Sequence, residues 1–320
     1  MTTVIETERL TKIFGHQNPA VSNLSISVPE GSCYGFLGPN GAGKTTTIKM
    51  LLGLVIPTAG HVKVFGEGMR PDSSHLRSKI GYLPTNPMFP PHMKPIQYLD
   101  YSARLFGMIR ETRYPRVSEL LRAVNLLSAT ATSIKDFSTG MTTRLGIAAS
   151  LINDPELLIY DEPTLGLDPG GRASTLALIK ELAKEKTVFL ASHILGDVER
   201  VCSHVGVIND GKLIYEGTTR DLKDAIRKNS VNLELEGDIH SFLEGVRGLP
   251  AVVDVEVDGF RVSISFVEGC DYTKTLISVL EIAAAGQMAI TSISSETATL
   301  EDAFLALVDR EESRGILRAL

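Results

Sequence analysis

The sequence predicts an α/β protein that carries a second, smaller α+β domain at its C-terminal end. Over the first ~220 of 320 residues, short apolar runs with strand character alternate with longer segments of helical period. A glycine-rich segment, Gly38–Thr45, stands directly between one such run and a helix. Beyond residue 229 the pattern of apolar residues changes and predicts short elements in the order β-α-β-β-α-β. We therefore expect two domains, 1–228 and 229–320.

The N-terminal residues indicate an antiparallel sheet that precedes a buried strand. Apolar and polar residues alternate in Val4–Leu10 and Leu24–Val28, which predicts two strands with one buried face each. The run Cys33–Leu37 predicts a buried strand, and a helix is expected over Lys44–Leu52, directly after the glycines. His61–Phe65 predicts one further strand.

A helical insert interrupts this α/β domain. No strand is evident between Pro90 and about Ile152. Apolar residues recur there at helical period in three segments, Ile96–Met108, Arg116–Leu126 and Met141–Ile152. We therefore expect the insert to span residues 90–152.

The strands of the main sheet resume after the insert. Three apolar runs predict buried parallel strands, Leu157–Tyr160, Thr187–Ala191 and Val205–Ile208. The turn Asn209–Gly211 leads into Lys212–Tyr215, which predicts a β-hairpin. A helix is expected over Thr219–Lys228, and the polar pair Asn229-Ser230 after it marks the predicted domain boundary.

The C-terminal domain is predicted to have a ferredoxin-like split fold. The expected strands are Val231–Glu236, Val252–Val257, Phe260–Phe266 and Ala289–Ile293. The expected helices are Ile239–Val246 and Tyr272–Ala284, and an amphipathic helix follows at Leu300–Val308. The second and third strands form a hairpin across Asp258-Gly259.

Composition favours a globular protein of the cytoplasm. Apolar residues make up 43% of the chain, and no run approaches the roughly 18 consecutive apolar residues that cross a bilayer. The N-terminus carries Glu6 and Glu8 and lacks the apolar core of a signal peptide. The three cysteines are widely spaced, which favours structural thiols in a reducing compartment over a metal site. The net charge of −6 argues against broad nucleic-acid binding.

A phosphate-binding motif stands between the strand at Cys33–Leu37 and the helix after it. The segment Gly38-Pro39-Asn40-Gly41-Ala42-Gly43-Lys44-Thr45 fits the pattern G-x-x-x-x-G-K-[ST], and Thr46 follows it. Glycines let backbone N–H groups turn towards phosphate oxygens, and the helix N-terminus adds a partial positive charge. Lys44 can reach the β- and γ-phosphates, and the Thr45 hydroxyl can bind Mg²⁺. We therefore expect residues 38–46 to bind the phosphates of a nucleotide together with Mg²⁺.

Two adjacent carboxylates, Asp161 and Glu162, follow the apolar run Leu157–Tyr160. Two carboxylates at the end of a buried strand are costly unless they serve a cation or a reaction. Asp161 suits the Mg²⁺ shell. Glu162 points elsewhere because it is one residue further, and it suits a general base that orients the attacking water.

Further motifs resemble those of the ABC ATPases, in order and spacing, over residues 1 to about 220. The segment Phe137-Ser138-Thr139-Gly140-Met141 is similar to the family's LSGGQ signature, and Ser138 is a good N-cap for the helix that it opens. Gly166-Leu167-Asp168 resembles the family's D-loop, and Ser192-His193 resembles its switch-histidine loop. Phe14 stands where the family stacks an aromatic ring on adenine.

Two positions depart from the family's pattern. The signature keeps Ser138 and Gly140 but has Phe, Thr and Met at its other positions. After Gly81-Tyr82-Leu83-Pro84 stands Thr85, where the family usually has Gln or Glu. The role of this loop in Mg²⁺ binding and in coupling is therefore open.

The resemblance implies a mechanism that needs two cassettes in a head-to-tail pair, here a homodimer. ATP would lie between Lys44, Thr45 and Asp161 of one subunit and the signature residues Ser138–Gly140 of the other. Glu162 would activate water, and His193 would contact the γ-phosphate and stabilise charge during transfer.

The C-terminal domain resembles the small domain of drug-exporter-type ATPases, down to the segment Thr299-Leu-Glu-Asp-Ala-Phe304. This resemblance implies an ATP-hydrolysing subunit, peripheral on the inner face of the cell membrane, that serves a permease formed by a separate chain. The helical insert and the Thr85 region would contact that permease. The alternative is a soluble ABC protein acting on ribosomes or DNA, but only one phosphate motif and no sustained heptad run occur here. The transported substrate stays open: a drug, lipid, polysaccharide, peptide or ion.

Overall fold

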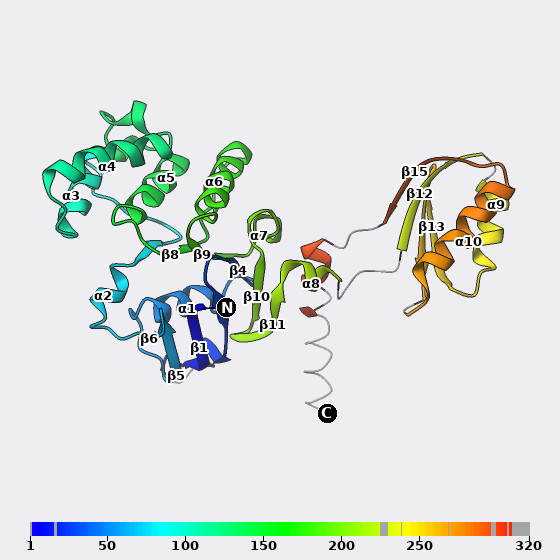
Figure 1. Cartoon of the computed structure of the whole chain (residues 1–320), viewed down its shortest axis with the longest axis horizontal. Coiled ribbons are helices and arrows are strands. Elements are labelled where there is room, and N and C mark those ends of the chain that lie inside the picture. The colour runs from blue at the N-terminus through cyan, green and yellow to red at the C-terminus, as the bar shows by residue number, and fades with distance from the viewer. Residues whose placement is uncertain are drawn as a thin grey trace. The chain divides into compact units, whose positions relative to one another are not determined.

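The computed structural model describes residues 2–15, 18–224, 230–237, 239–267, 269–295, 299–305 and 307–308 (Figure 1). Two compact units emerge, one formed by residues 1–219 together with the last described residues, 307–308, and one by residues 220–306. The second unit thus begins close to the helix α8 (Thr219–Asp224), which is the described part of the helix expected over Thr219–Lys228. The predicted boundary at 228/229 lies outside the described residues and stays a prediction.

The first unit opens with an antiparallel sheet of five strands. They are β1 (Thr3–Lys12), β2 (Val21–Leu24), β3 (Ser27–Pro29), β5 (Ala59–Val64) and β6 (Glu67–Gly68). The prediction of one strand over Leu24–Val28 is wrong, because Thr7 interrupts it. The Thr7 hydroxyl donates to the carbonyl of Leu24 at 3.0 Å and accepts from the N–H of Ile26 at 3.0 Å. This side chain takes the place of a ladder partner and separates β2 from β3.

The main sheet of the first unit has six strands in the order β11-β10-β4-β9-β8-β7. Their bounds are Cys33–Leu37 (β4), Ile80–Leu83 (β7), Leu157–Asp161 (β8), Thr187–Ser192 (β9), His204–Asn209 (β10) and Lys212–Thr218 (β11). Strands β10, β4, β9, β8 and β7 are parallel, and β11 returns antiparallel to β10. The predicted parallel strands and the hairpin are confirmed. The short strand β7 was not predicted, and it places Thr85 just beyond the same carboxyl edge as Gly38, Glu162 and His193.

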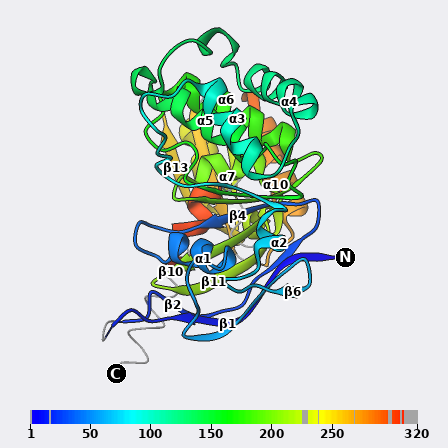
Figure 2. The same ribbon diagram turned by 90° about the vertical axis from the view of Figure 1, so that its left-hand side faces the viewer.

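The helical insert is confirmed. It contains α3 (Pro95–Leu105), α4 (Arg110–Ala123) and α5 (Thr139–Ser150), with short 3₁₀ turns at Leu127–Ala129 and Ile134–Asp136. These helices lie at the end of the first unit that is remote from the five-stranded antiparallel sheet (Figures 1 and 2).

Helix α4 begins six residues before the predicted start at Arg116 and contains Pro115. Proline close to the start of a helix removes a single hydrogen bond, which the rest of the helix tolerates. The helix ends before the predicted Leu126 because Asn125 adopts a left-handed backbone, with φ of 57°.

Four further helices accompany the sheets of the first unit. They are α1 (Lys44–Leu51), α2 (Ser74–Arg77), α6 (Pro169–Leu182) and α7 (Leu195–Val201). Helix α1 directly continues the phosphate motif, as predicted. Helices α6 and α7 follow β8 and β9, so their first turns start near the carboxyl edge of the sheet. None of the helices in the described part of the chain combines the length and hydropathy that crossing a bilayer requires.

The second unit shows the predicted β-α-β-β-α-β order. Its sheet runs β13-β14-β12-β15, all antiparallel, from β12 (Ser230–Glu236), β13 (Val252–Asp258), β14 (Arg261–Phe266) and β15 (Ala289–Ser295). Helices α9 (Ile239–Arg247) and α10 (Tyr272–Ala285) cover one face of it (Figure 1). Residues 300–305 and 307–308 are helical, within the helix expected over Leu300–Val308, while Ala306 lies outside the described residues.

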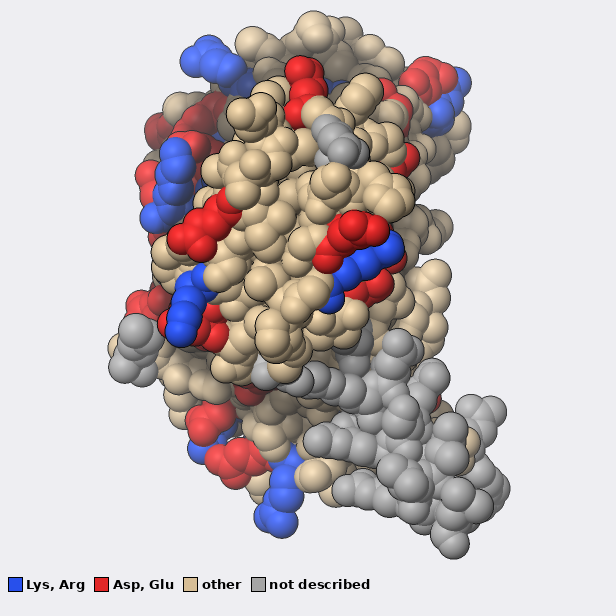
Figure 3. All heavy atoms as spheres, turned by 90° about the vertical axis from the view of Figure 1, so that its right-hand side faces the viewer, with Lys and Arg blue, Asp and Glu red and all other residues tan. Residues whose placement is uncertain are grey.

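The core of the second unit lies between its sheet and its two helices. Leu233, Val262 and Ile264 from the strands pack there with Phe242 and Val279 from the helices. Residues that alternate with the strand members, such as Ser263 and Ser265, lie on the other face of the sheet. Figure 3 views the molecule from the side of α9 and α10, and uncharged side chains cover most of that surface.

Candidate functional site

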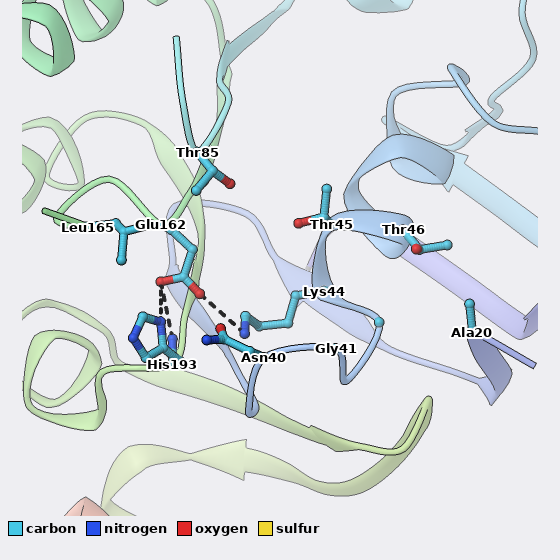
Figure 4. A pocket seen from close by; sticks show the side chains of 11 residues that line it. Ala20, Asn40, Gly41, Lys44, Thr45, Thr46, Thr85, Glu162, Leu165 and His193 are labelled. Atoms are coloured by element: carbon cyan, nitrogen blue, oxygen red, sulfur yellow. Dashed lines mark hydrogen bonds and ion pairs between the residues drawn. The ribbon is translucent and has the colours of Figure 1, made fainter.

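A pocket lies in the first unit at the carboxyl edge of its parallel strands (Figure 4). The residues that line it come from the phosphate motif and the start of α1, from the loops after β7, β8 and β9, and from the residue before β2. They are Ala20, Asn40, Gly41, Gly43, Lys44, Thr45, Thr46, Thr85, Glu162, Leu165 and His193.

The glycines of the phosphate motif are required by the backbone path. Gly41 and Gly43 have φ of 85° and 104°, a left-handed region that other residues rarely adopt. A Cβ atom at Gly43 would lie 2.4 Å from the carbonyl oxygen of Ala20, and one at Gly38 would lie 2.3 Å from that of Ile208. The loop therefore curls tightly before Lys44, and the first N–H groups of α1 open towards the pocket.

Lys44 is buried, with 6% of its side chain exposed, and its ammonium group is tightly held. The Nζ atom donates to the carbonyl oxygens of Gly38 at 2.7 Å and Pro39 at 3.1 Å. It also lies 3.2 Å from the Oε1 atom of Glu162, with which it forms an ion pair. The side chain thus bridges the phosphate motif and the end of β8 across the pocket (Figure 4).

Asp161 faces Thr45 and provides oxygen atoms suited to Mg²⁺. The Thr45 hydroxyl donates to its Oδ2 atom at 2.8 Å. Burial raises the pKa of Asp161, and hydrogen bonds from Thr45 and Thr85 partly offset that effect. Its Oδ1 atom is buried and has no hydrogen-bond partner among the described residues.

An orphaned carboxylate oxygen beside a hydroxyl fits a hard cation, because Mg²⁺ prefers oxygen ligands. No cluster of three or more His, Cys, Asp or Glu side chains suited to a metal occurs in the described part of the chain. A Mg²⁺ ion at a nucleotide needs only one or two protein ligands, which act together with substrate phosphates and water. Thr45 and Asp161 are therefore the residues that would hold the ion.

Glu162 points away from Asp161, as expected, because its backbone turns sharply with φ of 53°. Its Oε2 atom lies 2.8 Å from Nδ1 of His193 and accepts from the backbone N–H of the same residue at 3.3 Å. The carboxylate is 8% exposed and the imidazole 31% exposed, and both residues line the pocket. A base held by a second group in this way can orient a water molecule for attack on a phosphate.

Six predicted nucleotide-binding residues are not among those that line this pocket: Gly38, Pro39 and Ala42 of the phosphate motif, and Phe14, Ser138 and Gly140 outside it. Phe14 is 46% exposed, and the ammonium of Lys12 lies 5.1 Å from the centre of its ring. Ser138 caps α5, where its Oγ atom accepts from the N–H of Met141 at 3.3 Å, and Gly140 is in the first turn of the same helix. A surface position of Ser138 and Gly140 is what a site shared between two subunits requires.

Ala20 and Leu165 line the pocket and were not predicted from the sequence. Neither side chain has a functional group that a sequence motif would identify. Leu165 stands between Glu162 and the predicted D-loop, and this position in the sequence could have indicated that it lies at the site.

Comparison with known proteins agrees with this site. Residues 21–165 match the family model described as ABC transporter. The bacitracin transport ATP-binding protein BcrA of Bacillus licheniformis is 44% identical over 71% of this chain and 74% of its own length. The linearmycin resistance ATP-binding protein LnrL of Bacillus subtilis is 33% identical over 96% of this chain and 99% of its own. A solved structure titled as the ATP binding subunit of an ABC transporter is 28% identical, with a TM-score of 0.63, over 70% of this chain and 93% of that one.

The fold and the pocket define a P-loop ATPase of the cassette type. The chain belongs to the ABC transporter ATP-binding proteins. It is an ATP-binding and ATP-hydrolysing subunit, as the sequence predicted.

The Thr85 hydroxyl offers a test of the departure from the family's Gln or Glu. Because the Thr85 side chain helps to lower the pKa of Asp161, its removal by Thr85→Ala is expected to raise the Mg²⁺ concentration for half-maximal ATPase activity. The maximal rate should fall by less than about tenfold, or ~1.4 kcal/mol of barrier, because water can replace the lost donor. Thr85→Ser keeps the hydroxyl and serves as the control in an Mg²⁺ titration. An unchanged Mg²⁺ requirement would show that Thr85 only shapes the loop, and a hundredfold loss of rate would show a direct ligand.

Proposed function

We propose that this subunit hydrolyses ATP in a head-to-tail homodimer and drives export through a permease formed by a separate chain. The observation that carries this proposal is the pocket that joins Lys44, Thr45 and Glu162 with His193, close to Asp161. In each composite site, these residues would bind the phosphates and Mg²⁺, and Ser138–Gly140 of the second subunit would close it. The chain would then be peripheral on the inner face of the cell membrane.

Export is favoured by the relatives that match the chain. Their names describe bacitracin transport, linearmycin resistance and Nod factor export. The match to LnrL spans both units, so the small C-terminal unit accompanies the cassette in that relative as well. The substrate pathway belongs to the permease, so these names support the direction of transport and leave the substrate class open.

The helical insert offers an apolar surface for the permease. Tyr101, Leu105 and Ile109 are 53%, 70% and 63% exposed, and Tyr101 and Leu105 share one face of α3 because they are four residues apart. Phe106, at the end of the same helix, is 45% exposed. Large apolar side chains gathered on one surface mark an interaction site more often than scattered ones do.

The expected result of Leu105→Glu combined with Ile109→Glu is loss of co-purification with the permease when the two proteins are expressed together. A charge buried in an apolar contact is costly, so the complex should dissociate while the cassette still binds ATP. Leu54→Glu is the matched control, since Leu54 is 61% exposed in another part of the unit. Retained co-purification of the double variant would place the contact elsewhere.

The C-terminal residues 229–320 are expected to be dispensable for nucleotide binding. Every residue of the pocket belongs to the first unit, and the second unit has its own sheet and core. A purified fragment 1–228 should therefore bind a fluorescent ATP analogue with the affinity of the full chain. A fragment that is folded by circular dichroism but has lost this affinity would contradict the independence of the cassette.

A further inference from the structure

A buried carboxylate outside the predicted motifs joins three segments of the active site. Asp197, in the first turn of α7, has 2% of its side chain exposed. Its Oδ2 atom accepts a hydrogen bond from the Thr164 hydroxyl at 2.5 Å, and its Oδ1 atom accepts one from Nε of Arg172 at 2.6 Å. Both oxygens of the carboxylate are therefore engaged.

The two donors flank the loop that follows the general base. Thr164 stands two residues after Glu162, and Arg172 is in the first turn of α6. Between them lies the predicted D-loop, and the Asp168 side chain caps α6 by accepting from the N–H of Gly171 at 3.2 Å. Asp197 thus holds both ends of this loop.

Asp197 itself belongs to the segment that carries the switch histidine, because it stands four residues after His193. Two ties therefore connect the loop after β8 with the loop after β9. One is the direct contact of Glu162 with His193, at 2.8 Å. The other is the contact of Thr164 with Asp197, and neither of these two residues is among those that line the pocket.

Burying a carboxylate costs several kcal/mol unless charge and hydrogen bonds offset it. A pair of apolar side chains would fill the same space without that cost. An Asp that uses both oxygens to join three segments gives them one defined geometry, because hydrogen bonds are directional where apolar contacts are not.

We propose that Asp197 is a positioning residue for ATP hydrolysis. It sets the separation between the loops after β8 and β9, and thereby keeps the Glu162 carboxylate within hydrogen-bonding distance of His193. Because small displacements of a catalytic group reduce rates strongly, loosening this tie should slow the chemical step. Binding of ATP should be preserved, since residues 38–46 belong to the loop after β4 and the start of α1, and neither is joined to Asp197 by these hydrogen bonds.

The test is steady-state ATPase kinetics on the full chain. Asp197→Asn weakens the contact with Arg172 and is expected to lower kcat about tenfold, with KM for ATP changed by less than about twofold. Thr164→Val removes the hydroxyl and should lower kcat similarly, whereas Thr164→Ser should retain the wild-type value. The double variant should be no slower than the slower single variant, because both substitutions break the same tie.

Arg200→Gln is the matched control, because Arg200 is an exposed charged residue at the end of the same helix. Thermal melting and ADP binding establish that each variant is folded. If Asp197→Asn does not fold, the comparison of kcat between Thr164→Val and Thr164→Ser still tests the proposal. The proposal is overturned if the folded variants keep the wild-type kcat. It is also overturned if the loss appears in KM alone, if Thr164→Ser is as slow as Thr164→Val, or if the two substitutions act additively.

Discussion

Replacing Lys44 by alanine is expected to lower kcat for ATP hydrolysis by at least about a hundredfold, or ~2.7 kcal/mol of barrier. Lys44 is the only Lys or Arg among the described residues that line the pocket. Its ammonium group is already positioned between the carbonyl oxygens of the phosphate motif and Glu162. Thr45 and Asp161 would hold Mg²⁺, but neither side chain carries a positive charge that could replace the ammonium group of Lys44.

The measurement is phosphate release by the purified variant at saturating Mg-ATP. Lys49→Ala removes an exposed lysine from the last turn of the same helix, and it should leave the rate unchanged. A thermal melt separates lost chemistry from lost folding. Near-normal turnover of a folded Lys44→Ala protein would refute the assignment of the phosphate motif.

Glu162→Gln should still bind ATP but hydrolyse it at a rate lower by a factor on the order of 10² to 10⁴, the usual contribution of a general base. The amide retains the size of the carboxylate, and its carbonyl oxygen can still accept from the N–H of His193. It loses the proton affinity that a base requires. Because ATP then persists in both composite sites, the closed dimer should accumulate.

Size-exclusion chromatography with Mg-ATP and with Mg-ADP measures that dimer directly. Glu156→Gln is the control, since Glu156 is an exposed residue immediately before the start of the same strand β8. A Glu162→Gln variant that hydrolyses ATP at the wild-type rate would remove Glu162 from the role of base. A variant that is inactive yet monomeric with ATP would contradict the proposed closure step.

Local pattern was enough to predict most of the cassette. The phosphate motif is one contiguous segment, and its glycines are dictated by the backbone path that the structure shows at Gly38 and Gly43. The buried parallel strands were also found, because their apolar runs carry the signal within a few residues. The ferredoxin-like order of the second unit was predicted for the same reason.

Features that depend on residues far apart in the chain could not be predicted from the sequence. The break between β2 and β3 is caused by Thr7, which is 17 residues from Leu24 in the chain. The Thr164 hydroxyl and the Asp197 carboxylate are 33 residues apart, and no spacing rule links them. The ion pair of Lys44 with Glu162 is likewise a product of the way β4 and β8 lie on either side of β9.

The small C-terminal unit has a core of buried apolar side chains between its own sheet and its own two helices, and its described strands pair with one another. Selection on its interior is therefore uncoupled from selection on the nucleotide-binding sheets. A substitution in this unit can therefore change its surface while the residues of the nucleotide pocket stay the same. The small unit is thus a place where contacts with new partners can arise without changes to the residues that bind and hydrolyse ATP.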